Sequence, residues 1–176
     1  YQSEWTSKPA LHLFPQWNWK KGDAVDVWAY YNNADEVELY LNGKSLGKRS
    51  KTDATLHVSW KVVFEPGTLK AVSRKNGNTV LLKEIKTAGV PAKIELITDR
   101  KSIKANGKDL AFVTVRILDK NDKLVPEAYI QVEFSVSGAG FLAGTDNGFQ
   151  ADTSSLKNSK RTTWKGLALA IIQSGQ

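Results

Sequence analysis

Residues 36–47 read E-V-E-L-Y-L-N-G-K-S-L-G, and this stretch decides the fold class. The apolar residues Val37, Leu39 and Leu41 alternate with more polar neighbours, which is the period of a strand with one buried face. The strand runs directly into Asn42-Gly43. Both central residues of a two-residue hairpin turn need positive φ, and Asn and Gly tolerate it best. The stretch therefore predicts a β-hairpin that packs on a core.

The same signals recur through the first half of the chain. A second hairpin is predicted from Thr68–Lys75, the turn Asn76-Gly77 and Thr79–Thr87. Alternating segments at Ala24–Tyr31 and Leu56–Val63 predict two more strands, whereas helical periodicity is almost absent. Short strands joined by tight turns are typical of an all-β sandwich.

A seam is predicted at residues 87–91, which read T-A-G-V-P, because Gly and Pro interrupt the strand pattern there. Beyond the seam, residues 138–140 and 145–161 are expected to be loops, and strands are predicted at Lys93–Thr98, Leu110–Leu118, Ile130–Val136 and Trp164–Ile172. The predicted fold class is all-β, with two consecutive antiparallel β-sandwiches at residues 11–89 and 90–176.

The second sandwich ends early. Only Ser174-Gly175-Gln176 follow its last predicted strand, whereas a seven-stranded sandwich closes with one more strand paired to that edge. We therefore expect residues 90–176 to lack the last strand and to expose an edge through which another copy could pair as a homo-oligomer. The chain begins at Tyr1 and contains no methionine, so we also expect it to be a piece of a longer protein.

The composition of the 176 residues excludes several classes of protein. The net charge is +7 and its excess is spread over both halves, without a docking motif for nucleic acid, so we expect a solvated basic surface and no nucleic-acid partner. The absence of cysteine excludes a disulfide scaffold and a thiolate metal site. The longest apolar run, residues 167–172, is far shorter than the roughly 20 residues of a membrane helix, so no membrane partner is expected.

A search for catalytic or metal-binding residues finds no active site. His12 and His57 lie in different segments, and neither belongs to a His-rich metal motif or to a Ser-His-Asp arrangement. His57 alternates with Leu56 and Val58, so we expect it to face solvent on a strand. Residues 146–148 read D-N-G like a fragment of a calcium loop, but the other ligands are missing and a simple turn fits better. We predict no catalytic residue, no metal and no cofactor.

Several segments resemble a known family. Residues 1–6, Y-Q-S-E-W-T, and 11–19, L-H-L-F-P-Q-W-N-W, resemble the end of the catalytic barrel and the first accessory domain of bacterial β-galactosidases of glycoside hydrolase family 2. Gln16 stands where the family usually has His. The 36–47 hairpin and residues 65–72, E-P-G-T-L-K-A-V, continue the resemblance. From Pro91 onward the chain is similar to the Ig-like, invasin-type domain that comes next in such enzymes, although residues 149–163 match poorly.

The resemblance implies a non-catalytic part of a hydrolase. Family 2 enzymes are retaining, with two glutamates about 5–5.5 Å apart on a barrel. No glutamate of this chain stands in those motifs. Residues 1–10 would be a remnant of the barrel's end and residues 11–89 and 90–176 two Ig-like sandwiches. Their expected role is to buttress the barrel of the same chain and to shape its cleft, in the periplasm or outside the cell.

Trp17 and Trp19 are the candidate carbohydrate contacts, because the resemblance places them where the chain leaves the barrel and where a ring could stack on a sugar. The competing interpretation is that these rings fill the core or the seam with a neighbour. Two other classes stay open. A carbohydrate-binding module requires a line of exposed rings, which only the first 40 residues could supply; a cell-surface adhesin or stalk requires two similar repeats, which the halves do not show.

Overall fold

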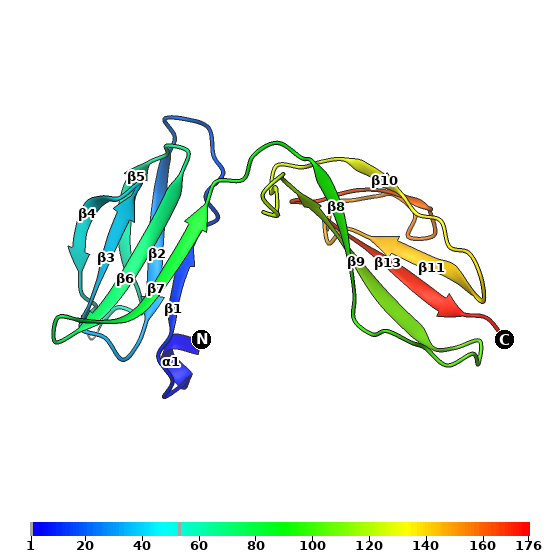
Figure 1. Ribbon diagram of the computed structural model, residues 1–176, viewed down its shortest axis with the longest axis horizontal. Coiled ribbons are helices and arrows are strands. Elements are labelled where there is room, and N and C mark those ends of the chain that lie inside the picture. Colours follow the sequence, from blue (N-terminus) through cyan, green and yellow to red (C-terminus); the bar gives the residue numbers. More distant parts are fainter. Residues whose placement is uncertain (1, 53) are drawn as a thin grey trace. The chain divides into compact units, whose positions relative to one another are not determined.

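The computed structural model describes residues 2–52 and 54–176, and their regular secondary structure is almost entirely β-strand. The chain divides into two compact units, unit 1 at Tyr1–Thr87 and unit 2 at Ala88–Gln176 (Figure 1). All of the strand pairs within each unit are antiparallel. The predicted fold class, consecutive antiparallel β-sandwiches, is confirmed.

Unit 1 contains a short helix and two facing sheets. The helix α1 covers Gln2–Trp5. One sheet has three strands in the order β1-β2-β5, which are Leu11–Phe14, Ala24–Tyr31 and Val58–Val63. The other has four in the order β4-β3-β6-β7, which are Lys44–Arg49, Glu36–Leu41, Thr68–Lys75 and Asn78–Lys86.

Both predicted hairpins of unit 1 are confirmed. Asn42 and Gly43 have φ values of 52° and 86°, and Asn76 and Gly77 have 49° and 78°, so each turn uses the positive φ that Asn-Gly supplies. The Asn42 side chain also joins two turns: its Oδ1 accepts from the Thr68 amide at 2.9 Å and its Nδ2 donates to the Pro66 carbonyl at 3.1 Å. The turn residue therefore fixes the register of β3 against β6.

The core of unit 1 follows the period of two that the sequence predicts. On β3 the alternating residues Val37 and Leu39 are completely buried, and Leu41 lies at the core's edge. Alternate residues of β2 and β5 meet them from the opposite sheet. The outward residues of β2 and β5 are left on the surface, and these include Trp28 and Tyr30.

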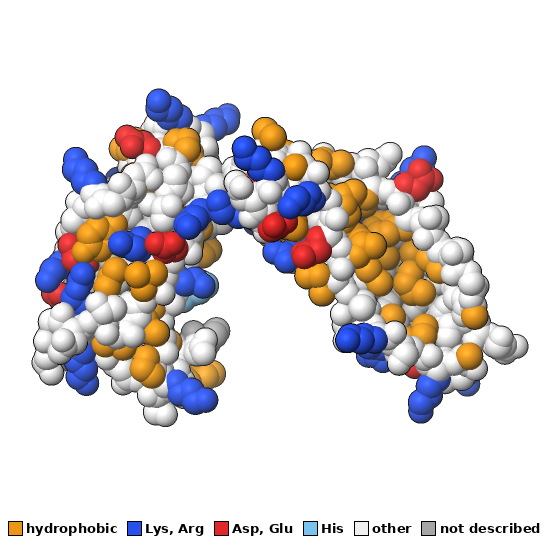
Figure 2. All heavy atoms as spheres, viewed as in Figure 1, with side chains coloured by type: hydrophobic (Ala, Val, Ile, Leu, Met, Phe, Trp, Pro, Cys, Tyr) orange, Lys and Arg blue, Asp and Glu red, His pale blue; other side chains and the backbone are white. Residues whose placement is uncertain are grey.

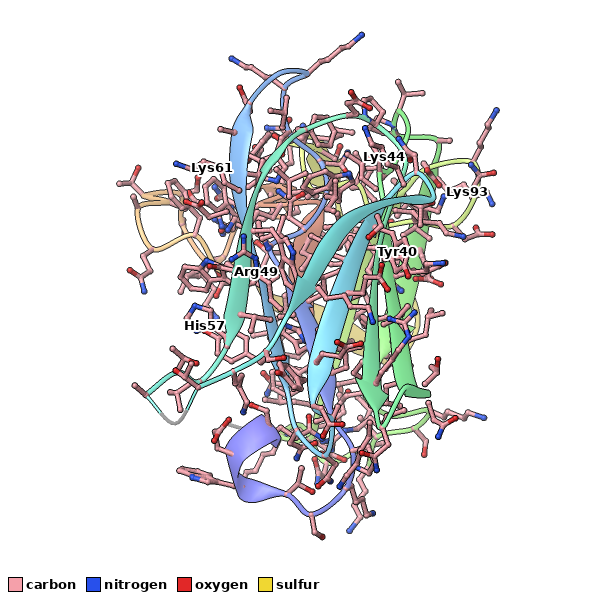
Figure 3. All side chains as sticks on the ribbon, turned by 90° about the vertical axis from the view of Figure 1, so that its left-hand side faces the viewer. Tyr40, Lys44, Arg49, His57, Lys61 and Lys93 are labelled. Carbon is pink, nitrogen blue, oxygen red and sulfur yellow. The ribbon has the colours of Figure 1, made fainter. Side chains whose placement is uncertain are left out.

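The basic residues of the first hairpin are mostly paired. Lys48 forms an ion pair with Glu36 at 2.7 Å and Lys51 with Glu4 at 3.0 Å. The Arg49 guanidinium lies 5.8 Å from the centre of the Trp60 ring, whereas Lys44 lies at the other end of the same strand and Lys61 lies on β5 (Figure 3). Because the cations pair with carboxylates and rings of this same unit, the surface here is a salt-bridged sheet edge.

Unit 2 has one large and one small sheet. The large sheet has the order β11-β13-β9-β8, which are Gly140–Asp146, Leu167–Ser174, Leu110–Leu118 and Lys93–Thr98. The small sheet pairs β10, Gln131–Glu133, with β12, Lys160–Thr162. Buried Asp119 fastens the start of the unit, because its carboxylate accepts from the amides of Gly89, Asn121 and Lys123 at 2.8–3.0 Å. These bonds lower the pKa of Asp119.

The large sheet of unit 2 is only partly covered by the small one. Leu96 is opposite Val115 in the register, and cross-strand partners share a face; Val115 is buried but Leu96 is 63% exposed. The uncovered part is an apolar groove of about 300 Å³, which we call the open apolar face; its lining includes Leu96, Val113, Phe134, Val136 and Ile172. Figure 2 shows hydrophobic side chains gathered on this unit. The last strand of unit 2, β13, lies between β11 and β9. Any further strand would therefore have to pair with another strand of this unit and not with β13.

The open apolar face predicts dye binding by this chain. Contiguous exposed apolar surface binds the dye ANS, so we expect fluorescence enhancement in the folded chain. Leu96→Glu places a charge in the groove and is expected to remove most of the signal. Leu82→Glu, at an exposed position of β7, is the matched control. If Leu96→Glu leaves dye binding intact, the dye does not bind to the open apolar face. Self-association through unit 2 is a separate prediction.

No helix in residues 2–52 or 54–176 is long and apolar enough to cross a membrane.

Candidate functional site

Five ring side chains form an aromatic face on the outside of the β1-β2-β5 sheet. The outward positions of β1 and β2 and the residue just before β5 supply them: His12, Phe14, Trp28, Tyr30 and His57. In the register His12 lies opposite Tyr30, and Phe14 opposite Trp28. The alternation that buries the inward residues of these strands therefore places the five rings together on the surface.

Four rings of the aromatic face form a chain of contacts. The Trp28 ring lies 5.9 Å from Phe14 and 4.7 Å from His57, measured between ring centres, and Tyr30 lies 5.0 Å from His57. Such tilted pairs are favourable beyond the area that they bury. Phe14 is nevertheless 49% exposed, and the other rings also keep exposed surface. The face is a rigid aromatic surface, because its rings are held by paired strands and by each other.

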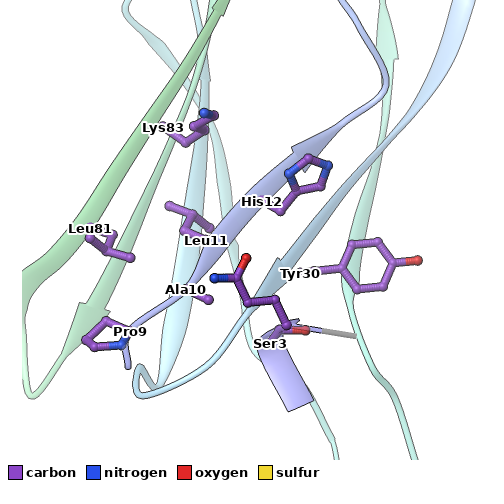
Figure 4. Close-up of a pocket in the computed structure, with 9 residues that line it drawn as sticks. Ser3, Pro9, Ala10, Leu11, His12, Tyr30, Leu81 and Lys83 are labelled. Carbon is purple, nitrogen blue, oxygen red and sulfur yellow. The ribbon is translucent and has the colours of Figure 1, made fainter. Parts of the chain in front are cut away.

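A pocket of about 570 Å³ lies beside the aromatic face, between β1 and β7. His12 and Tyr30 form one wall, and Leu81 and Lys83 of β7 lie across from them (Figure 4). The segment before β1 closes it, held by two bonds of Asn32: Oδ1 accepts from the Ala10 amide at 2.7 Å, and Nδ2 donates to the Thr6 carbonyl at 2.9 Å. The aromatic face thus continues into a concave surface with an apolar wall.

The two tryptophans predicted to contact carbohydrate lie in different surroundings. Trp17 is 1% exposed, its ring meets Phe64 edge-on at 5.0 Å, and its indole N–H donates to the Glu65 carbonyl at 3.1 Å. Trp19 is 44% exposed, with its indole N–H donating to the Gln16 carbonyl at 2.9 Å. The structure does not bring them to one surface. Sugar contact stays a prediction for both, and only Trp19 presents ring surface to a ligand.

The side chains that could bind a metal ion are dispersed in the part of the chain that the structure describes. Among residues 2–52 and 54–176, no three His, Asp or Glu side chains lie close enough to hold a metal ion. The Asp146 carboxylate accepts from the amides of Asn147 and Gly148 at 2.6 Å and 3.0 Å, and Gly148 has a φ of 73°. The D-N-G segment is therefore the turn that the sequence favoured.

The sequence indicated parts of the aromatic face but not that its rings lie together. Phe14, Trp28 and Tyr30 lie in the first 40 residues, where a line of exposed rings was one alternative and rings that fill the core were the other. His57 joins them because it occupies the position before β5 that faces Tyr30, and its alternation with Leu56 and Val58 was the signal. A second aromatic cluster lies in unit 2, and of its three rings only Phe149 falls in the predicted loop 145–161.

Two family models match the chain. Residues 94–176 match glycoside hydrolase family 2 C-terminal domain 5, and residues 22–81 match a domain of unknown function, DUF4982. The first match covers most of unit 2, and the second covers most of unit 1.

Longer proteins match nearly the whole chain. A β-galactosidase of Bacteroides ovatus is 53% identical over 98% of the chain, and a β-glucuronidase of Formosa agariphila is 28% identical over 81%. The crystal structure of a glycosyl hydrolase family 2 member from Bacteroides cellulosilyticus matches with a TM-score of 0.93, at 32% identity over 99% of the chain.

The chain accounts for a minor part of each relative. It spans 20% and 15% of the length of these two enzymes and 26% of the solved chain. The matched part is a pair of β-sandwiches and not a catalytic barrel, so it is an accessory, non-catalytic part of a glycoside hydrolase. The chain belongs to the C-terminal region of glycoside hydrolase family 2, and its unit 2 is a member of the C-terminal domain 5 family.

Proposed function

We propose that this chain supports the catalytic barrel of a retaining β-galactosidase within one polypeptide, and that the aromatic face is the surface that packs on the barrel. The observation that carries the proposal is the exposure of five rings on one sheet, four of which form a chain of ring contacts. Aromatic side chains are enriched and charged ones depleted at the centres of protein interfaces. The barrel would supply both catalytic glutamates, and this region would hold the barrel and shape the rim of its cleft.

The charges and the pocket around the aromatic face are arranged as expected for contact with another protein domain. Charges on this face lie at one end, where Asp26 and Lys61 are opposite each other in the register. The rings lie away from that end and pass into the pocket walled by His12, Tyr30 and Leu81. A flat aromatic centre beside a concave pocket that Leu81 and Lys83 help to line fits a protruding side chain of a partner domain, which is the arrangement of an interface hot spot.

The substrate class of the proposal rests on the relatives. The β-galactosidase of Bacteroides ovatus is 53% identical to this chain, whereas the relatives from Formosa agariphila that are named β-glucuronidases are 28–36% identical. We therefore favour a terminal β-galactoside as the substrate of the whole enzyme. The reaction would take place on barrel residues, so variants in this chain are expected to change stability and substrate affinity before they change the chemical step.

The test of this proposal compares Trp28→Ala in the long enzyme and in this chain alone. Truncating an aromatic side chain at an interface hot spot to alanine weakens the binding free energy by about 2 kcal/mol or more. We expect Trp28→Ala to lower the free energy of unfolding by about 2 kcal/mol more in the long enzyme than in the chain alone, as measured by denaturant titration, because only the long enzyme contains the contact.

The matched control is Tyr40→Ala on the outer side of the other sheet, where Lys70 Nζ lies 4.8 Å from the ring centre. This ring is outward and half-buried but lies off the aromatic face, so its effect should be equal in both proteins. Equal effects of Trp28→Ala in the two proteins would refute packing of the barrel on the aromatic face.

A further inference from the structure

The long segment between β11 and β12 builds a groove in unit 2. The groove has a volume of about 320 Å³, and its lining includes Tyr129, Phe149, Trp164, Asn147 and Asp152. Phe149 stacks on Trp164 with ring centres 4.2 Å apart and planes 21° from parallel, and Tyr129 lies 5.5 Å from Trp164. Tyr129 is 51% exposed and Phe149 is 40% exposed. Two rings therefore present open surface while the third supports them from beneath.

A buried arginine holds the walls of this groove in place. The Arg161 side chain is almost fully buried, and it donates to the Asp152 carboxylate at 2.8 Å, to the Ser155 carbonyl at 2.8 Å and to the Thr145 carbonyl at 3.0 Å. These bonds tie the segment to β11 and β12 without help from a ligand. A site formed before binding loses less conformational entropy when a ligand arrives.

Asn147 links the segment that carries Phe149 to the carboxylate of Asp152. Its Nδ2 donates to Asp152 Oδ2 at 2.8 Å and to the Thr162 carbonyl at 2.9 Å, and its Oδ1 accepts from the Phe149 amide at 2.9 Å. One amide side chain thus connects the backbone of Phe149 with the carboxylate of Asp152, the two residues that flank the groove.

The polar wall of the groove carries a permanent acceptor. The hydroxyl and amide of Ser154, and then the Arg161 guanidinium, hold the pKa of Asp152 well below its usual range, so the carboxylate is ionised at neutral pH. An ionised carboxylate accepts strong hydrogen bonds from hydroxyl groups. Thr153 and Thr162 also line the groove and add hydroxyl groups to it. The guanidinium that balances Asp152 is buried behind this wall. An exposed cation, Lys165, lies beside the groove, with its Nζ 5.7 Å from the centre of the Trp164 ring.

From this geometry we propose that the groove binds a neutral pyranose unit of a glycan. The apolar C–H face of the ring would lie on Phe149 and Tyr129, because apolar groups pack favourably on aromatic faces. The hydroxyl groups at its edge would donate to Asp152 Oδ1, since Oδ2 already accepts from Asn147 and Arg161. An anionic sugar acid fits less well, since its carboxylate would face that of Asp152. This contact is separate from the barrel-supporting role and would retain the enzyme on glycan chains.

The test uses this chain labelled with ¹⁵N and titrated with β-1,4-galactobiose, with digalacturonic acid as the anionic counterpart. Shifts in the amide spectrum locate the binding site, and calorimetry gives the affinity. We expect galactobiose to shift the amides of residues 147–154 and 162–164, and digalacturonic acid to bind at least tenfold more weakly. Loss of one stacking ring is expected to weaken galactobiose binding about tenfold in Phe149→Ala, and Tyr129→Ala tests the other exposed ring.

Phe141→Ala is the matched control, because Phe141 is an exposed phenylalanine of β11 outside the groove, and it should leave the affinity unchanged. Each variant's amide spectrum reports whether unit 2 is folded, which separates loss of binding from loss of structure. The proposal is overturned if galactobiose shifts no groove amide at its solubility limit. Equal affinity in Phe149→Ala and Phe141→Ala, or tighter binding of digalacturonic acid, would also overturn it.

Discussion

Replacing Arg161 with methionine is expected to lower the free energy of unfolding of unit 2 by about 3–5 kcal/mol, the cost of removing one partner of a buried ion pair. Methionine keeps much of the volume but none of the donors. The carbonyls of Thr145 and Ser155 and the carboxylate of Asp152 would each lose a hydrogen bond in a buried or partly buried setting. Denaturant unfolding followed by the amide spectrum of unit 2 measures the effect.

Arg116→Met provides the comparison for this prediction. Arg116 lies in β9 of the same unit and pairs with Glu95 at 2.8 Å, but both side chains are partly exposed to solvent. An exposed ion pair contributes about 0–1 kcal/mol. If Arg161→Met destabilises unit 2 no more than Arg116→Met does, the Arg161 bonds do not hold the groove together.

The Asp152–Arg161 pair also predicts a dependence of stability on pH. The pKa of Asp152 is lowered in the folded chain, first by Ser154 and then by Arg161, from an ordinary value of 3.8. The unfolded chain therefore binds a proton on Asp152 before the folded chain does as the pH falls. Its contribution to stability is full above about pH 4–5 and declines through the acid range below that. Unfolding midpoints measured from pH 6 to pH 2 should fall less steeply in Arg161→Met.

Trp17→Ala is the second change with a large expected effect. Deleting a buried tryptophan costs about 3–5 kcal/mol, because transfer energy is lost and a cavity remains. Here the Phe64 ring would lose its edge-on partner and the Glu65 carbonyl its indole donor. Thermal and denaturant unfolding of unit 1 measure the loss. A Trp17→Phe variant keeps a ring in the core and removes the donor, so its cost should be nearer 1–2 kcal/mol.

Trp19→Ala is the natural control, since Trp19 lies two residues away and is partly exposed. Surface substitutions usually change stability by less than about 0.5 kcal/mol, and the loss of its bond to the Gln16 carbonyl adds a small amount. A stability loss in Trp19→Ala as large as that in Trp17→Ala would show that Trp17 is not the anchor of this core.

Regular alternation made much of unit 1 predictable. Strand β2 lies at the predicted Ala24–Tyr31, and β3 ends at Leu41 where Asn42-Gly43 requires a turn. In unit 2, β8 and β9 also have the predicted bounds. In these segments local propensity, hydrophobic period and turn chemistry agree, which is the condition under which a sequence predicts its own elements.

Strands β11 and β12 were missed for physical reasons. Strand β11 includes Gly140 and Gly144 and has a register irregularity between Leu142 and Gly144, and glycine weakens the sequence signal of a strand. Strand β12 has three residues, and its buried member is Arg161. A charged residue on the core side inverts the expected alternation, because its burial depends on Asp152, a partner that hydropathy does not reveal.

The groove in unit 2 was hidden from the sequence for a related reason. Tyr129, Phe149 and Trp164 are separated along the chain, and no period connects them. They meet because β10 pairs with β12 and because Arg161 fixes the intervening segment. The aromatic face of unit 1, in contrast, arises from the outward positions of paired strands, so alternation alone indicates which of its rings share a side.

The most direct test of the accessory role is hydrolysis of a chromogenic β-galactoside, assayed with this chain alone and with the long enzyme that carries it. The account predicts turnover by the long enzyme and none by the chain, because the chain has no paired carboxylates in the barrel motifs of the family. Turnover by the chain alone, at a rate that scales with its concentration, would contradict the assignment of these two sandwiches as a non-catalytic part of the hydrolase.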